Sequence, residues 1–179
     1  MMGYRRIVFL IAGIATMFIG SSGVPPVAAE VRLAWVHVDA THKKLSLTIT
    51  AAPNGANGTL NFNGYANGQM TITVPVGWQV HIDFENIGAG TLPHSLEVIR
   101  EVHPVPVEGI APAIPRAETS FLVEGVSPNP PNNKDSVDFT AAPAGQYLLI
   151  CGVPRHAISG MWNRFVVSSS AHLPIVTLK

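Results

Sequence analysis

The chain has 179 residues, of which 47% are hydrophobic and only 12% are charged, and its 11 Lys and Arg residues balance its 11 Asp and Glu residues. A neutral chain without a basic cluster is not expected to bind nucleic acid, because such binding needs a positive surface. The low charge content predicts a fairly apolar surface, which suits contact with other proteins or with a membrane.

The N-terminus has the layout of an export signal. Two arginines precede the apolar residues 7–20, and small residues before Glu30 suit a cleavage site. This apolar stretch is shorter than the ~20 residues that a spanning helix needs. We therefore expect residues 1–29 to be a signal peptide, with an uncleaved membrane anchor as the alternative. Residues 30–179 then form one domain, which we expect in the periplasm or on the outer face of the cytoplasmic membrane.

The rest of the chain predicts many short β-strands. Apolar and polar residues alternate in most of them, as in Val80, Ile82 and Phe84, which indicates strands with one face on a core. The expected strands, in chain order, are residues 31–40, 44–50, 58–66, 69–75, 79–86, 94–99, 119–125, 136–142, 145–152 and 162–169. Turn clusters rich in Gly, Pro and Asn separate them, and no long helical period occurs. The pattern predicts an all-β domain, either a β-sandwich or a barrel.

Two segments depart from this pattern. The proline-rich residues 100–120 are expected to form a long surface excursion between strands, and residues 127–135 are expected to form a second loop. Neither segment indicates a boundary to a second domain.

Cys151 is the only cysteine in the chain. In an exported protein it cannot form an internal disulfide, so it is a free thiol, an intermolecular bridge or a metal ligand. It begins the segment CGVPRHAISGMW, in which His156 and Met161 follow at intervals of five residues. One predicted strand ends at Cys151 and another begins near Met161. The loop between them therefore brings all three side chains to one end of the domain.

His94 is the histidine that we expect to join them. It follows a glycine-rich loop and Pro93 and opens a predicted strand, so it can reach the same end of a sandwich. The other histidines are interpreted as ordinary strand, loop or tail residues: His37, His42, His81, His103 and His172.

Two imidazoles, one thiolate and a weakly bound thioether suit copper that cycles between Cu(I) and Cu(II). Soft sulfur ligands stabilise Cu(I), and imidazoles serve both oxidation states. We expect Ser95 and Asn86 to hydrogen bond near the thiolate and to tie the two ligand segments together. An apolar collar around the metal is expected from Leu92, Pro154, Ile158 and Trp162.

The pairing of PHSL with CGVPRHAISGMW resembles the ligand set of the cupredoxins, the small blue copper proteins. Among these the sequence is most similar to the sulfocyanins, and next to rusticyanin. The resemblance implies a Greek-key sandwich that binds one type 1 copper ion through His94, Cys151, His156 and Met161. Sulfocyanins are typically exported and often membrane-associated, which agrees with the N-terminal segment.

We therefore expect a monomeric electron carrier, without enzymatic activity, that serves redox partners such as a cytochrome or a terminal oxidase. Its electron exit is expected at the edge of His156. A copper chaperone or storage protein is the alternative. A fragment of a multicopper oxidase or nitrite reductase would need additional histidines for a second copper. A metal-free adhesion module would leave the Cys-His-Met spacing to chance.

Overall fold

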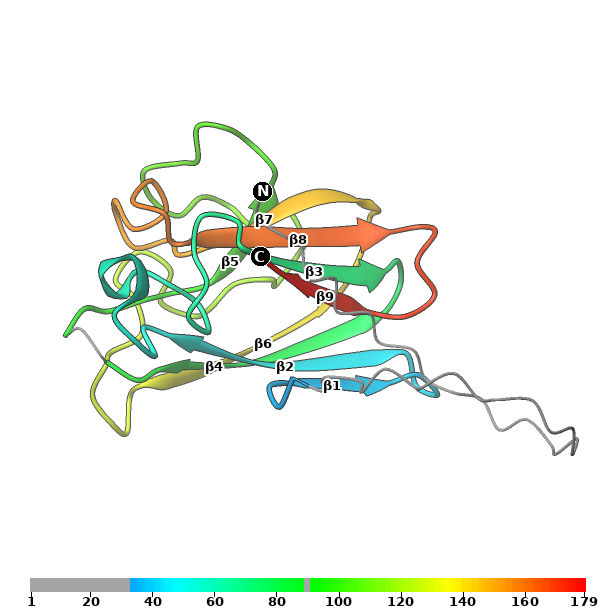
Figure 1. Ribbon diagram of the computed structural model, residues 1–179, viewed down its shortest axis with the longest axis horizontal. Helices are drawn as coiled ribbons and strands as arrows, with labels where there is room; N and C mark the ends of the chain where they lie inside the picture. The colour runs from blue at the N-terminus through cyan, green and yellow to red at the C-terminus, as the bar shows by residue number, and fades with distance from the viewer. Residues whose placement is uncertain (1–32, 89–90) are drawn as a thin grey trace, which may run out of the picture.

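A computed structural model describes residues 33–88 and 91–179, and within these ranges nine strands form two sheets that pack face to face (Figure 1). The predicted signal segment, residues 1–29, and the first two residues of the predicted strand 31–40 lie outside the described residues. In the described ranges there is no helix long and apolar enough to cross a membrane.

The first sheet has four strands in the order β1-β2-β4-β6. These strands are β1 (Val36–Asp39), β2 (Lys44–Ala51), β4 (Gln79–Asn86) and β6 (Lys134–Thr140). β2 and β4 run parallel, and the other neighbours run antiparallel. Every second residue of β2 and β4 is buried, as the alternation in the sequence predicts.

The second sheet has five strands in the order β5-β7-β8-β3-β9. These strands are β5 (Glu97–Arg100), β7 (Gly145–Ile150), β8 (Trp162–Ser168), β3 (Met70–Pro75) and β9 (Ile175–Leu178). β3 and β8 run parallel, and the other neighbours run antiparallel. The two mixed sheets make the all-β Greek-key sandwich that the sequence predicts.

A single apolar core fills the space between the sheets. It contains inward-facing side chains of both, for example Leu47 and Ile82 from the first sheet and Ile72 and Leu149 from the second. The rings of Phe139 in β6 and Phe165 in β8 meet edge to face, with centroids 5.8 Å apart. This core fixes the two sheets against each other, so the loops at one end of the sandwich start from rigid strands.

Two strand predictions are wrong, and one strand in the described residues has no prediction. Residues 58–66 form turns and part of a short 3-10 helix, η1 (Ala56–Thr59), because left-handed backbone at Gly58, Asn63 and Gly64 cannot continue a pleated strand. Residues 119–125 also form turns, which end at Gly125 with φ of 77°. Strand β9 was not predicted, because its four residues were interpreted as a tail.

Candidate metal centre

Strands β7 and β8 position the loop that runs from Cys151 to Met161. Cys151 directly follows β7 and Met161 directly precedes β8, and the Cys151 N–H donates to the Met161 carbonyl over 3.1 Å. Within the loop, the Ser159 N–H donates to the Arg155 and His156 carbonyls, and the Met161 N–H donates to the His156 carbonyl. A loop closed at its base and folded on itself holds its side chains with little freedom.

His94 arrives from a different part of the chain, three residues before β5. It forms an isolated antiparallel bridge with Val126, whose N–H donates to the His94 carbonyl over 2.7 Å. Since β5 pairs with β7, the start of β5 lies beside the end of β7. This pairing brings His94 to Cys151 across 57 residues of sequence.

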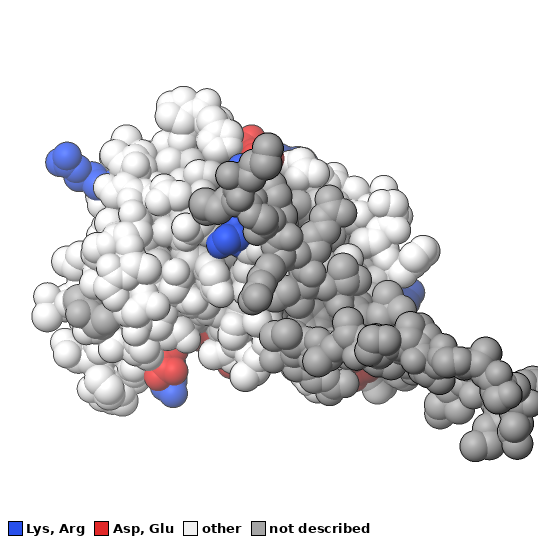
Figure 2. All heavy atoms as spheres, in the orientation of Figure 1, with Lys and Arg blue, Asp and Glu red and all other residues white. Residues whose placement is uncertain are grey.

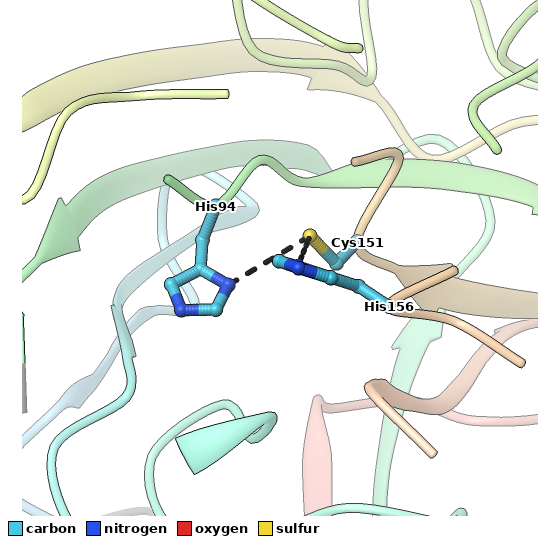
Figure 3. Close-up of side chains that lie close together, drawn as sticks. All are labelled: His94, Cys151 and His156. Atoms are coloured by element: carbon cyan, nitrogen blue, oxygen red, sulfur yellow. Dashed lines mark hydrogen bonds between the residues drawn. The ribbon is translucent and has the colours of Figure 1, made fainter. Parts of the chain in front are cut away.

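The two imidazoles face the sulfur of Cys151 from opposite segments (Figure 3). Cys151 Sγ lies 3.5 Å from His156 Nδ1 and 4.0 Å from His94 Nδ1. The ligand atoms of the three residues all lie within 4.8 Å of one another, and the two rings are 5.0 Å apart between centroids. Cys151 and His94 are fully buried, whereas His156 is partly exposed.

This geometry fits a metal ion bound by one sulfur and two nitrogens. With bonds of about 2.3 Å to sulfur and about 2.0 Å to nitrogen, a trigonal arrangement separates the sulfur from each nitrogen by about 3.7 Å. The two observed separations, 3.5 and 4.0 Å, bracket this value. The three side chains therefore need only small adjustments to hold such an ion.

The electrostatics of the site also favour a cation. Burial lowers the pKa of His94 to about 4, and repulsion from His156 contributes to the same shift. Burial lowers the pKa of His156 as well, so both rings are neutral and offer lone pairs near neutral pH. Burial raises the pKa of the Cys151 thiol to about 11. A thiolate at this position therefore needs a positive ion beside it.

Ser95 joins the two ligand segments, as predicted. Its N–H donates to Cys151 Sγ over 3.3 Å, and its Oγ accepts a hydrogen bond from the Gly152 N–H over 2.9 Å. The Ser95 hydroxyl donates in turn to the Leu122 carbonyl over 2.6 Å. The sulfur thus receives a backbone hydrogen bond that stabilises its thiolate form.

Asn86 has a different role from the one predicted. Its amide donates to the carbonyls of Leu92 and Val126, over 2.9 and 3.0 Å, and its Oδ1 accepts from the Gly88 N–H. It therefore fixes the loop before His94 and does not contact the sulfur. The pairing of β4 with β6 explains this, because Asn86 at the end of β4 faces the segment that precedes β6.

The predicted apolar collar stays a prediction for its exposed members. Leu92, Pro154 and Ile158 are exposed and available as a rim. The prediction for Trp162 is wrong. Trp162 packs on the outer face of the second sheet, in a small cluster with Ile99, Leu148, Ile150 and Ala157. Met161, directly before β8, is buried in the main core, and Trp162, the first residue of β8, therefore lies on the opposite face of the sheet.

Of the other residues singled out in the sequence, Met161 lies at the base of the ligand loop and the histidines lie outside the cluster. Met161 is fully buried in the main core at the base of the loop. His81 lies on the outer face of the first sheet between Asp83 and Asp138, and His103 packs on Trp162. His42 pairs with Asp39. None of these three histidines belongs to the cluster of His94, Cys151 and His156.

Two contributors to the site were missed in the sequence. Leu122 packs over Gly152, where an added Cβ would lie 2.6 Å from the Leu122 side chain. Glu97, between Leu96 and Val98, is completely buried because the proline-rich loop covers it and the Ile110 N–H donates to its Oε1. A lone glutamate between two core residues was the only sequence signal for Glu97. Leu122 was assigned to a strand instead.

Known proteins share this sequence pattern and this fold. The family model described as the sulfocyanin (SoxE) domain matches residues 32–178. Sulfocyanin from Sulfolobus acidocaldarius is 31% identical over 147 residues, which cover 77% of this chain and 70% of that protein. Rusticyanin from Acidithiobacillus ferrooxidans is 32% identical over 99 residues, which cover 54% of this chain and only about half, 49%, of that protein. A crystal structure of a methionine-to-glutamine variant of rusticyanin has the same fold, with a TM-score of 0.51 at 22% identity over 70% of this chain and 78% of that one.

Proposed function

The chain belongs to the sulfocyanin family of cupredoxins, and on that premise we propose that it carries single electrons between partners of a respiratory chain outside the cytoplasm. Cupredoxins are blue copper electron carriers rather than enzymes, and they bind one type 1 copper ion. Their partners are redox proteins. The assignment to a respiratory chain is supported by the export signal predicted for residues 1–29 and by the sulfocyanin match.

The convergence of two Nδ1 atoms on the buried Cys151 sulfur is the observation that carries this proposal. His94, Cys151 and His156 would hold the copper ion, and Met161 would be a further, weakly bound sulfur ligand. Copper held in this way supplies a one-electron couple between Cu(I) and Cu(II).

The protein holds the proposed ligands in fixed positions and excludes water from them. His94 and His156 keep their Nδ1 atoms aimed at the sulfur, and the Ser95 N–H stabilises the sulfur in its charged form. Because the loop is closed by backbone hydrogen bonds at its base, its ligands cannot relax far when the charge of the site changes. Complete burial of Cys151 and His94 keeps water from the sulfur.

His156 is the proposed route for the electron, because it is only partly buried, whereas His94 and Cys151 are fully buried. Exposed apolar side chains flank it in the loop, among them Pro154 and Ile158, and Arg155 is the one exposed charged residue beside them. Figure 2 shows few charged side chains on the face that it displays, in keeping with the low charge of the chain. A partner could approach such a surface without displacing many tightly held waters.

A copper chaperone or storage protein remains the second candidate. It would use the same ligands but release the metal to a recipient. Buried ligands on a loop that is pinned between two paired strands favour retention of the metal over its exchange. Electron transfer is therefore the better match.

Visible and EPR spectra of the full chain with one equivalent of Cu(II) test the proposal. We expect an intense thiolate-to-copper charge-transfer band and a small copper hyperfine splitting, both lost in Cys151→Ser. The control is His103→Gln, which removes a histidine outside the cluster and should leave both signals intact. A pale protein with an ordinary tetragonal Cu(II) signal that survives Cys151→Ser would refute the ligand set.

Two kinetic measurements distinguish an electron carrier from a copper chaperone and test the respiratory role. A carrier should accept and return an electron many times while it keeps its copper in the presence of a Cu(I) chelator. Rapid loss of copper to the chelator would favour the chaperone. Reoxidation of the reduced protein by respiratory membranes, blocked by a terminal-oxidase inhibitor, is the expected sign of a respiratory role. No reoxidation above the rate in buffer would contradict it.

A further inference from the structure

An asparagine- and glycine-rich segment, residues 54–68, packs against the loop that carries Cys151, His156 and Met161. In Figure 1 the two segments, coloured teal and orange, lie at the same end of the sandwich. Asn57 and Ser159 are hydrogen bonded across 102 residues of sequence. The contact is therefore a product of the tertiary fold, and the proposed electron transfer does not by itself account for it.

Asn57 is the side chain that makes this contact. Its amide Nδ2 donates to the Leu60 carbonyl and to the Ser159 carbonyl, each over 2.9 Å. Its backbone lies in the left-handed region, with φ of 49° and ψ of 38°, which asparagine tolerates better than most residues. An exposed side chain thus links its own turn to the ligand loop.

The segment also holds the next residue of the loop. The Asn67 N–H donates to the Gly160 carbonyl over 2.8 Å. Gly160 has φ of 102°, and a Cβ added there would lie 2.6 Å from the Asn67 side chain and 2.8 Å from Asn57 Nδ2. The segment therefore donates hydrogen bonds to the carbonyls of both residues before Met161, Ser159 and Gly160. It approaches Gly160 so closely that only glycine fits there.

These contacts reach the proposed ligands through the backbone of the loop. The Ser159 N–H donates to the His156 carbonyl over 3.2 Å, and the Met161 N–H donates to the same carbonyl over 3.0 Å. A shift of Ser159 therefore moves His156 and Met161 together, relative to a Cys151 that is anchored at the end of β7. Hydrogen bonds that orient a ligand from outside in this way commonly change metal affinity by about 10–100-fold.

We propose that Asn57 is a positioning residue for the copper centre, which it controls by holding the Ser159 carbonyl and so the place of His156 and Met161. The inference rests on the proposed ligand set. This positioning role requires an N–H donor on a short side chain at a residue with left-handed backbone, and asparagine supplies both.

The test compares three variants of the full chain. Asn57→Gly keeps the left-handed backbone and removes the amide, whereas Asn57→Asp keeps the shape and replaces the donor by an acceptor. The matched control is Asn63→Gly, since Asn63 also has a positive φ but donates to and accepts from β2 at Thr48 and Thr50. The measurements are copper affinity by chelator competition, the visible and EPR spectra, and amide hydrogen exchange of Met161 in the copper-free protein.

Both Asn57 variants should bind copper about 10-fold more weakly, shift the relative intensities of the charge-transfer bands, and exchange the Met161 amide faster. Asn63→Gly should leave all three properties as in the unmodified chain, even where it lowers the midpoint of unfolding. Unchanged properties in both Asn57 variants would overturn the proposal, and so would equal shifts in Asn63→Gly. If the unmodified chain shows no Cys151-dependent blue copper signal, the proposed function fails, and exchange at Met161 still decides whether Asn57 holds the loop.

Discussion

Replacement of the buried glutamate Glu97 by glutamine should remove a pH-dependent destabilisation of the fold. Glu97 is completely buried at the start of β5. Its Oε1 accepts from the Ile110 N–H over 3.2 Å, and its Oε2 has no partner among residues 33–88 and 91–179. Burial raises the pKa of this carboxyl from 4.5 to about 7, and repulsion from Glu118 contributes to the same shift.

The size and sign of the effect follow from this pKa. Between pH 4.5 and pH 7 the folded protein keeps a proton on Glu97 that the unfolded chain has released, so stability falls as the pH rises. A shift from 4.5 to about 7 corresponds to about 3 kcal/mol, at about 1.4 kcal/mol per pH unit. The destabilisation is absent below pH 4.5 and complete above pH 7. Glutamine has no such proton, and it keeps an acceptor for the Ile110 N–H.

Urea denaturation of the copper-free full chain from pH 4 to pH 8 measures this effect. The difference in unfolding free energy between Glu97→Gln and the unmodified chain should move in favour of the variant by about 3 kcal/mol over this range. Other titrating groups occur in both proteins and cancel in the difference. Glu108→Gln, at an exposed position of the same loop, is the matched control and should show no change with pH. A difference that varies by less than about 1 kcal/mol would refute the reasoning that burial, with repulsion from Glu118, holds the proton on Glu97.

Two further predictions follow from the site and its support. Copper binding at pH 7 should release close to one proton, because Cys151 with a pKa of about 11 is protonated and His94 with a pKa of about 4 is neutral. Calorimetry in buffers of different ionisation enthalpy measures the number of protons released. A value of zero or two would contradict these protonation states. Asn86→Ala should lower the free energy of unfolding by about 1–3 kcal/mol in urea, because the Leu92 carbonyl loses its donor and the Val126 carbonyl keeps only the His94 N–H. Asn132→Ala on an exposed loop is the control, and equal stability of the two variants would show that the Asn86 hydrogen bonds are dispensable.

The sequence alone was sufficient to predict features that depend only on residues close together in the chain. Strand β4 was predicted with its observed bounds, because every second residue from Gln79 to Asn86 meets the core. The Cys151 to Met161 loop was also predictable, since two adjacent antiparallel strands must close into a hairpin whose tip carries the residues between them. The alternation of apolar residues in a strand and the spacing of side chains in a short loop both depend on neighbouring residues, so both can be read from the sequence.

Only the tertiary structure decided how distant segments meet. The sequence favours His94 among seven histidines, but it is the pairing of β5 with β7 that sets its Nδ1 atom 4.0 Å from the Cys151 sulfur. The sequence predicts a strand over residues 58–66, yet these residues form turns, and Asn57 just before them donates to the Ser159 carbonyl. Glu97 became buried only because a loop from beyond β5 folds over it. Such contacts depend on the order of strands in a sheet and on which loop covers which edge, and no periodicity within one segment encodes either.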